Sequence, residues 1–444
     1  MVNRIGIRKE TKDKTQRRVP LSPGQVQELI GRQGLRVCVQ PMPNRVFPDA
    51  EYVSAGAEVR EDLSDCNIVF GVKEIQPAFM LDGMAYAFFS HTIKAQPYNM
   101  PMLRHILDHG ITLVDYELIK DDEGRRLVFF GNYAGYAGMI DSMWALGRRL
   151  EIEGLTTPFS RIRYATQYRL LADAEHEFRE VGARISSEGL PPALTPFVCG
   201  FTGYGNVSKG AQQLYDLLPV EVIAPAGLAD FFQRGEFSNR VVYKVEFREE
   251  DMFAALRPDA GFDLQEFYDH PERYRARFDE YLPFLTMMIN GIYWEPRYPR
   301  LITIEDARAL WSRPERPRLR VIGDITCDID GSIQMTVKET NAEAPVFIYE
   351  PLGGTVIDGV EGDGPVILAV DKLPTELPLE ASMAFGASLL PLVSALAAAD
   401  FRASYEELML PPELKRAVIA HAGRLTPDFA YLQSAVEDVN TGGE

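Results

Sequence analysis

The sequence contains few cysteines and histidines, and neither residue type falls into a metal-binding or disulfide pattern. Four cysteines are spread over 444 residues with no CxxC pair, which argues against a disulfide framework and against a sequence-local zinc site. Cys199 and Cys327 lie in apolar, strand-like stretches, where a small buried side chain is the expected role. The six histidines show no HExxH spacing, so we expect no metal centre.

Long apolar runs and an excess of positive charge are also lacking. No apolar run reaches the roughly 20 residues that a bilayer span needs, so we expect no membrane segment. The net charge is −18, with 64 acidic against 46 basic residues, which disfavours binding to nucleic acid or to an anionic membrane surface. The first residues, MVNRIGIRKE, lack the apolar core of a secretory signal, and a cytoplasmic location is the default expectation.

What is present is an ordinary globular composition with alternating strand and helix patterns. The chain is 46% hydrophobic and 25% charged, and its length favours two or three domains. Ser22 and Pro23 predict a helix start, and Gly34 predicts its end. Strand-like runs precede and follow this helix at 5–8, 67–72, 85–89 and 111–115. The alternation predicts a mostly parallel sheet.

Polar residues cluster where these predicted strands end. They are Arg8 and Lys9, Lys73, His91 and Lys94, and Asp115 and Glu117. Loops are polar in any protein, so one such residue alone means little. In open α/β sheets, however, ligands bind beyond the carboxyl ends of the strands. A group of cations with one histidine at successive strand ends therefore predicts a binding site.

A second α/β unit begins with a glycine turn between a strand and a helix, at 198–218. Gly203 and Gly205 allow close approach of the backbone, and the N–H groups at the start of the helix, from Asn206 and Val207, would face a pyrophosphate. Ser208 stands where the third glycine of GxGxxG is expected. Gly210-Ala211 would let the helix pack closely on the sheet. The turn predicts a dinucleotide site.

The next strand-like run, 220–227, ends in Ala224-Pro225 without an acidic residue. NAD sites usually place Asp or Glu at that position to bind the ribose hydroxyls, and an acid there would repel a 2′-phosphate. The pattern favours NADP(H), with NAD(H) as the alternative if the strand ends elsewhere.

Further strand and helix patterns alternate up to about residue 327, after which the sequence becomes irregular and rich in proline. We predict an α/β protein with two Rossmann-like domains and mostly parallel sheets. The cofactor domain, 136–327, would be inserted into a discontinuous substrate domain made of 1–135 and 328–444.

Nine sequence runs resemble the lysine-2-oxoglutarate reductase half of the bifunctional aminoadipic semialdehyde synthases. They resemble, more distantly, the fungal saccharopine dehydrogenases and the alanine dehydrogenase/transhydrogenase superfamily. The runs span nearly the whole chain: RRVPLSP (17–23), GVKE (71–74), AYAFFSHTIKAQ (85–96), DYE (115–117), FGNYAGYAGMID (130–141), TGYGNVSKGAQ (202–212), HPERYRARF (270–278), INGIYWE (289–295) and DITCDIDGSI (324–333).

The resemblance implies that L-lysine and 2-oxoglutarate condense to an imine, which a nicotinamide hydride reduces to saccharopine. It implies an acid–base pair formed by Lys73 and His91. The other implied residues bind substrate (Arg18, Gln96, Arg126, Phe130, Ile292, Tyr293, Trp294) or cofactor (Gly291, Asp324, Ile325). The chemistry agrees, because arginine binds carboxylates in bidentate fashion and histidine suits proton transfer near neutral pH.

Gln16 departs from the pattern, because relatives usually carry a glutamate beside the arginine pair. The bifunctional enzymes also continue into a saccharopine-oxidising half, so a separate protein is expected to process the product. Three alternatives stay open. They are an NAD-linked saccharopine dehydrogenase that releases lysine, an opine-type dehydrogenase that uses another amine, and a nucleotide-sensing protein without catalysis. The sequence predicts no oligomeric state.

Overall fold

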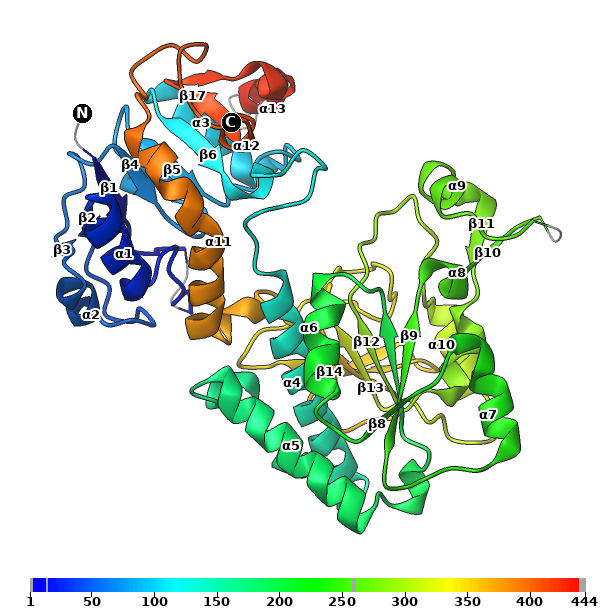
Figure 1. Cartoon of the computed structure of the whole chain (residues 1–444). Coiled ribbons are helices and arrows are strands. Elements are labelled where there is room, and N and C mark those ends of the chain that lie inside the picture. The colour runs from blue at the N-terminus through cyan, green and yellow to red at the C-terminus, as the bar shows by residue number, and fades with distance from the viewer. Residues whose placement is uncertain (1–2, 13–14, 258–259, 439–444) are drawn as a thin grey trace. The chain divides into compact units, whose positions relative to one another are not determined.

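The computed structural model describes residues 3–12, 15–257 and 260–438. The chain divides into two compact units, one made of residues 1–130 and 378–444 and the other of residues 131–377. Each unit contains a mostly parallel sheet with helices around it (Figure 1). The predicted α/β class with two such sheets is confirmed.

The first unit is built on an eight-stranded sheet of order β18-β17-β6-β5-β4-β1-β2-β3. Strands β1 to β6 pair in parallel, whereas β17 and β18 are antiparallel additions. The strands are β1 (Arg4–Ile7), β2 (Arg36–Val39), β3 (Glu58–Val59), β4 (Ile68–Phe70), β5 (Ala85–Phe88), β6 (Thr112–Asp115), β17 (Val418–His421) and β18 (Arg424–Leu425). The helices are α1 (Pro23–Gln33), α2 (Asp49–Ser54), α3 (Met100–Asp108), α11 (Pro378–Ala398), α12 (Pro412–Lys415) and α13 (Gln433–Asp438).

Local sequence signals explain why helix α1 begins and ends where it was predicted to. Ser22 caps α1 in a reciprocal capping box with Gln25, Pro23 is its first residue, and Gly34 ends it in the left-handed conformation at φ 65°. Glycine adopts this conformation without a steric penalty. The predicted start and end of this helix are confirmed.

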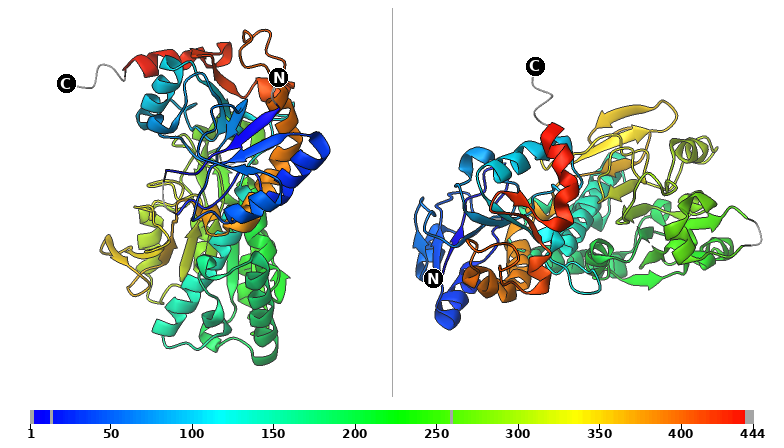
Figure 2. Two further views of the ribbon diagram at one scale, coloured as in Figure 1. Left: turned by 90° about the vertical axis from the view of Figure 1, so that its left-hand side faces the viewer. Right: turned by 90° about the horizontal axis from the view of Figure 1, so that it is seen from above.

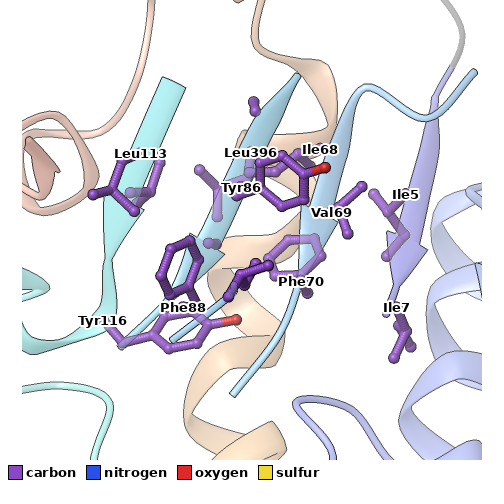
Figure 3. Close-up of a cluster of buried hydrophobic side chains, with 14 of the residues drawn as sticks. Ile5, Ile7, Ile68, Val69, Phe70, Tyr86, Phe88, Leu113, Tyr116 and Leu396 are labelled. Carbon is purple, nitrogen blue, oxygen red and sulfur yellow. The ribbon is translucent and has the colours of Figure 1, made fainter. Parts of the chain in front are cut away.

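The core of the first unit forms because its strands are apolar on both faces. Figure 3 shows side chains of β1, β4, β5 and β6 packed together with Leu396 of α11. The helix α11 lies beside α1, where the Gln25 amide donates to the Met383 carbonyl at 2.9 Å. The C-terminal helix α13 packs on α3 (Figure 2).

The expectation that no segment is apolar enough to cross a membrane is wrong for α11. This helix has 21 residues and is long and apolar enough, by length and composition alone, to cross a membrane. Length and composition are weak evidence for a membrane span, because a core helix of a globular domain meets the same criteria. Phe385, Leu389, Val393 and Leu396 are fully buried in the core of the first unit.

The second unit is built on an eight-stranded sheet of order β15-β14-β16-β13-β12-β7-β9-β8. Its strands are β7 (Val198–Thr202), β8 (Val220–Val222), β9 (Val242–Phe247), β12 (Met287–Asn290), β13 (Val321–Asp324), β14 (Val346–Glu350), β15 (Thr355–Asp358) and β16 (Val366–Leu368), with a separate hairpin of β10 (Phe253–Ala255) and β11 (Tyr274–Ala276). The helices are α4 (Gly131–Ile152), α5 (Leu171–Glu188), α6 (Asn206–Tyr215), α7 (Leu228–Arg234), α8 (Glu249–Met252), α9 (Leu264–Asp269) and α10 (Ile304–Trp311).

The domain boundaries differ from the predicted ones at 135/136 and 327/328. Helix α4 begins at Gly131 and belongs to the second unit. Residues 328–377 also belong to it, because β16 pairs in parallel with β13 and continues the same sheet. Strands β14, β15 and β16, which form one side of this sheet, were not predicted because their sequence is irregular and rich in proline. The tail that returns to the first unit begins at Pro378.

Close packing of α4 against α6 depends on two glycines. A Cβ atom at Gly135 would lie 2.0 Å from the Val207 carbonyl oxygen, and one at Gly210 would lie 2.2 Å from the Asn132 carbonyl oxygen. Gly210 therefore makes room for α4, and the prediction that it lets α6 approach the sheet is wrong.

Candidate functional site

The ends of β4 and β5 bring two predicted catalytic residues onto neighbouring strands. The two strands pair in parallel, and the pairing continues past their ends where the Phe89 N–H donates to the Val72 carbonyl at 3.1 Å. Lys73 follows Val72, and His91 follows Phe89 by two residues. The topology of the sheet therefore places Lys73 and His91 at one edge.

Glu74 holds the imidazole of His91. Its Oε1 atom lies 2.7 Å from His91 Nδ1 and 2.7 Å from Lys12 Nζ. Burial of Glu74 would raise the pKa of its carboxyl group, but the hydrogen bonds from His91 and Lys12 outweigh burial and lower the pKa to about 2. An ionised carboxylate keeps the proton of the imidazole on Nδ1 and directs Nε2 away from Glu74.

The backbone fixes the position of the histidine as well. His91 has a φ of 52°, an uncommon conformation for a residue with a side chain. Its carbonyl accepts a hydrogen bond from the Asn99 amide at 2.9 Å, and its ring stacks on Phe89 with 6.2 Å between centroids. Such strain tends to occur at functional sites, where surrounding contacts hold it.

Glu10 anchors the segment that carries Lys73. Its two carboxylate oxygens accept from the Val72 N–H at 2.8 Å and from the Lys73 N–H at 3.1 Å. Glu10 follows β1, and Arg8 of the same strand end lies 4.0 Å from its carboxylate. The backbone of Lys73 is thereby tied to the neighbouring strand.

Asp115 at the end of β6 supports the turn before His91. This fully buried carboxylate accepts from the Ser90 N–H at 3.0 Å, from the Ser90 hydroxyl and from the Glu117 N–H at 2.8 Å. Burial raises its pKa against these hydrogen bonds. Asp115 therefore acts on the fold of the strand ends.

Arg18 and Phe130 lie in contact beside Phe89, whose ring centroid is 6.0 Å from that of Phe130. The Arg18 guanidinium lies over the Phe130 ring at 4.3 Å from its centroid, and Phe130 stacks on Phe385 at 4.4 Å. The Oε1 atom of Gln16 accepts from Arg18 Nε at 2.9 Å. Gln16 thus positions Arg18 without adding a negative charge.

Arg126 and Gln96 are more exposed. Arg126 pairs with Glu117, and 48% of its side chain is accessible. Gln96 accepts a hydrogen bond from the Tyr98 hydroxyl at 2.9 Å. Their substrate-binding roles stay predictions.

Sequence reasoning missed three residues that organise these strand ends, namely Glu74, Glu10 and Lys12. Glu74 stood directly after Lys73 within the GVKE run, so its position next to a predicted catalytic residue was the available signal. Its contact with His91 joins positions 17 residues apart, and no spacing rule connects them.

The second unit contains a pocket of about 490 Å³ beside the glycine turn. The turn and the start of α6 form one wall, and residues that follow β9 and β12 form the others. The residues that line it are Gly203, Tyr204, Gly205, Asn206, Val207, Glu249, Met252, Phe253, Phe267, Tyr268, Gly291, Ile292, Tyr293, Trp294 and Tyr298.

The glycine turn leaves the N-terminus of α6 open to a ligand. Gly203 has a φ of 80°, and a Cβ atom there would lie 3.1 Å from Ile292. A Cβ atom at Gly205 would meet nothing within 4 Å, and no side chain caps the helix at Gly205. The helix N–H groups can therefore bind a phosphate, and aromatic rings opposite them suit a planar ring system.

Eight of the predicted residues in this unit line the pocket, and three do not. Ser208 is buried and accepts from the Gln212 amide at 3.1 Å. Asp324 accepts from Asn290 at 2.9 Å and from Thr336 at 2.6 Å. The Ile325 side chain packs where a Cβ atom of Gly138 would be. These contacts give the three residues a supporting place behind the pocket.

The strand order removes the basis of the NADP(H) prediction, which rested on the absence of an acidic residue after β8. Strand β9 lies between β7 and β8, so β8, which precedes Ala224-Pro225, is the outer strand and does not neighbour the glycine turn. The residues after β9 are the relevant ones. Arg248 lies over the Tyr204 ring at 5.1 Å, and Glu249 accepts from the Tyr268 hydroxyl at 3.0 Å.

The fold and the N-terminal region define the class of protein. Residues 6–137 match the family described as alanine dehydrogenase/PNT, N-terminal domain. An L-alanine dehydrogenase aligns with a TM-score of 0.60 over 98% of this chain and 99% of its own, at 19% identity. A transhydrogenase from Sinorhizobium meliloti aligns with a TM-score of 0.57 over 95% and 100%, at 17% identity. The chain has the fold of these proteins.

Sequence comparison gives closer relatives. The chain is 40% identical to the alpha-aminoadipic semialdehyde synthase of Arabidopsis thaliana, over 96% of this chain and 41% of the plant protein. It is 36% identical to the mitochondrial alpha-aminoadipic semialdehyde synthase of Bos taurus, over 98% and 48%. The chain thus spans less than half the length of these relatives. It is also 26% identical to the saccharopine dehydrogenase [NAD(+), L-lysine-forming] of Neurospora crassa, over 87% and 89%. The predicted resemblance is confirmed, because the chain is similar in sequence to the aminoadipic semialdehyde synthases over less than half of their length.

Proposed function

We propose that the protein is an oxidoreductase that joins L-lysine to 2-oxoglutarate and reduces the resulting imine to saccharopine. One NADPH and one proton are consumed, and NADP⁺ and water are released. The observation that carries the proposal is the Glu74–His91 contact at 2.7 Å, next to Lys73 on the neighbouring strand end, in a relative of the aminoadipic semialdehyde synthases.

Imine formation requires proton transfers at nitrogen and oxygen, and the two residues have separate roles in it. His91, oriented by Glu74, accepts a proton from the substrate ammonium so that the amine can attack the keto carbon. Lys73 donates a proton to the oxygen that leaves as water. Arg18 binds a substrate carboxylate, because its guanidinium is held by Gln16 and Phe130. Arg126 binds a second carboxylate at the more exposed side.

The pocket beside the glycine turn is the proposed cofactor site. The nicotinamide cofactor supplies the hydride, its pyrophosphate binds at the start of α6, and Gly291 leaves room beside it. We propose NADPH over NADH because Arg248, which lies over the Tyr204 ring and pairs with Glu246 at 3.5 Å, follows the strand next to the turn and supplies a cation for a 2′-phosphate. Glu249 is engaged by Tyr268.

The test is NADPH oxidation by the purified chain with lysine and 2-oxoglutarate, followed by mass analysis of the product. Saccharopine as the product supports the proposal. Faster turnover with NADH would favour the NAD-linked enzyme, and turnover with another amine in a substrate panel would favour an opine-type dehydrogenase. Tight cofactor binding without turnover on any amine would favour a nucleotide sensor.

The cofactor preference has its own variant. Arg248→Gln should raise the KM for NADPH by about 10- to 100-fold, because a charged hydrogen bond contributes roughly 1.5–3 kcal/mol, and should leave the KM for NADH nearly unchanged. Arg275→Gln, at an exposed arginine of the β11 hairpin, is the matched control. Equal effects on both cofactors would argue against a 2′-phosphate contact.

The cytoplasmic location stays a prediction.

A further inference from the structure

Two cysteine sulfur atoms meet over β1 in the first unit. Cys38 of β2 is the register partner of Gly6 in β1, and Cys66 precedes β4 on the other side of β1. Gly6 has no side chain, and a Cβ atom there would lie 3.4 Å from Cys66 Sγ. The Sγ atoms of both cysteines and a carboxylate oxygen of Asp65 lie within 4.8 Å of one another. Gly6 thus lets thiols from different parts of the sheet face each other.

The two sulfur atoms differ in their surroundings. Arg60 donates to Cys38 Sγ from Nε at 3.3 Å and from Nη2 at 3.1 Å. The neighbouring Cys66 thiol and Arg60 lower the pKa of Cys38 to about 6, against the effects of burial and of the Glu58 carboxylate, which lies 3.9 Å from Cys38 Sγ. The hydrogen bond to Cys38 and burial raise the pKa of Cys66. The surroundings favour a thiolate at Cys38 and a thiol at Cys66, as an attacking and a resolving cysteine require.

Access to the pair runs past charged side chains at the surface. Both cysteines are buried, at 1% and 6% exposure. The Arg60 side chain that covers Cys38 Sγ is itself 24% exposed, and Asp65 is 44% exposed. Oxidation of Cys38 by a small oxidant such as hydrogen peroxide therefore requires the Arg60 side chain to move away from the sulfur.

A metal ion fits this cluster less well than oxidation does. The carboxylate of Asp65 already pairs with Arg4 and Arg60. A divalent cation would have to displace both guanidinium groups, and the remaining positive charge would oppose its binding. The arginines instead suit a thiolate.

We propose that Cys38 and Cys66 form a redox-active dithiol that peroxides oxidise to a reversible disulfide. The Cys38 thiolate attacks hydrogen peroxide, which yields a sulfenic acid at Cys38 and hydroxide. The Cys66 thiol then attacks the sulfenic sulfur, so that an S–S bond forms and water leaves. A dithiol reductant restores both thiols. The disulfide would tie β2 to the segment before β4 across β1.

The test exposes the reduced full chain to hydrogen peroxide, alkylates the remaining thiols and maps the peptides by mass spectrometry. We expect a cross-link between residues 38 and 66, alkylated Cys199 and Cys327, and reversal by dithiothreitol. The oxidised chain should also unfold at a higher temperature, because the cross-link closes a loop in the unfolded state. Peroxide that leaves both thiols free, or that drives Cys38 only to sulfinic acid, would overturn the proposal.

Variants separate the roles of the residues. Cys66→Ser should leave a sulfenic acid at Cys38 that dimedone traps. Arg60→Gln should slow oxidation of Cys38 at neutral pH by about 10-fold, because less thiolate is present. Cys199→Ser, at a buried cysteine of the second unit, should change neither result. Stable zinc binding by the reduced chain together with resistance to peroxide would overturn the proposal. Alkylation rates of each cysteine in the unmodified chain provide the same test if a variant fails to fold.

Discussion

The contact between Glu74 and His91 determines which imidazole nitrogen can exchange a proton with a substrate. Because the pKa of Glu74 is lowered to about 2, the carboxylate stays ionised at every pH at which the protein is expected to work. It therefore acts as a fixed acceptor at Nδ1, which leaves Nε2 as the nitrogen for the proposed proton transfer. At the same strand ends, Glu10 fixes the backbone of Lys73.

Glu74→Gln tests this orientation. We expect kcat to fall by about 10- to 100-fold while cofactor affinity is unchanged, because a neutral amide neither fixes the tautomer nor stabilises the imidazolium. Steady-state kinetics and NADPH titration measure the two quantities. Asp82→Asn is the matched control, since Asp82 makes a 2.8 Å contact with His109 Nδ1 at the surface of the same unit. Equal losses in both variants would remove the special role of Glu74.

Lys73→Met tests the second proton-transfer residue. Turnover should fall by at least about 100-fold, because methionine keeps the length of the side chain but cannot donate a proton. NADPH affinity should stay nearly unchanged. Lys338→Met, at a half-buried lysine paired with Asp358, is the control. Near-normal turnover in Lys73→Met would remove Lys73 from the mechanism.

At the scale of elements, the features that sequence predicts are those with local causes. Helix α1 was predicted from Ser22, Pro23 and Gly34 because capping, a fixed φ and a left-handed turn involve only neighbouring residues. The order of β8 and β9 was not, because strand order depends on pairing between distant segments. The glycine turn was predicted because its signal is local. Arg248 was not, because its place beside the turn depends on the pairing of β9 with β7.

A buried pair of carboxyl groups joins α4 to the end of the second unit. Asp141 is fully buried and accepts from the Ala165 N–H at 2.7 Å, and Glu376 accepts from the Tyr164 hydroxyl at 2.5 Å. Burial and mutual repulsion raise the pKa of Asp141, and burial raises that of Glu376. We therefore expect one of the two carboxyl groups to hold a proton at neutral pH.

Asp141→Asn should therefore change how stability depends on pH. A group with a raised folded-state pKa contributes stability below its unfolded pKa of about 4 and loses it as pH rises through the folded pKa. We expect the variant to gain about 1–2 kcal/mol over the natural chain at pH 8, and less at pH 5, in urea unfolding.

The control for this prediction has the opposite sign. The Glu153 side chain is 7% exposed and pairs with Arg149 and Arg320, and these cations outweigh burial and lower its pKa. Its contribution is present above the unfolded pKa, so Glu153→Gln should destabilise the chain at neutral pH. A pH-independent effect of Asp141→Asn would show that the pair shares no proton.

At the scale of the whole molecule, each unit has its own hydrophobic core. One cluster of buried side chains lies entirely within residues 1–130 and 378–444, and two others lie entirely within residues 131–377. The predicted catalytic residues Lys73 and His91 belong to the first unit, and the pocket beside the glycine turn belongs to the second. In the proposed reaction, residues of the first unit transfer protons, and the second unit binds the cofactor that supplies the hydride.

NADPH should consequently stabilise the two units unequally. At 100 times its Kd, a ligand that binds only the folded state adds about 2.7 kcal/mol of stability. We expect hydrogen exchange to slow in peptides around the glycine turn, β9 and β12, with little change around β4 and β5 when lysine and 2-oxoglutarate are absent. Gly203→Val should abolish this protection, because its φ of 80° and the nearby Ile292 exclude a branched side chain. Protection that appears first at Lys73 and His91 would place the cofactor in the first unit and overturn the assignment of the pocket.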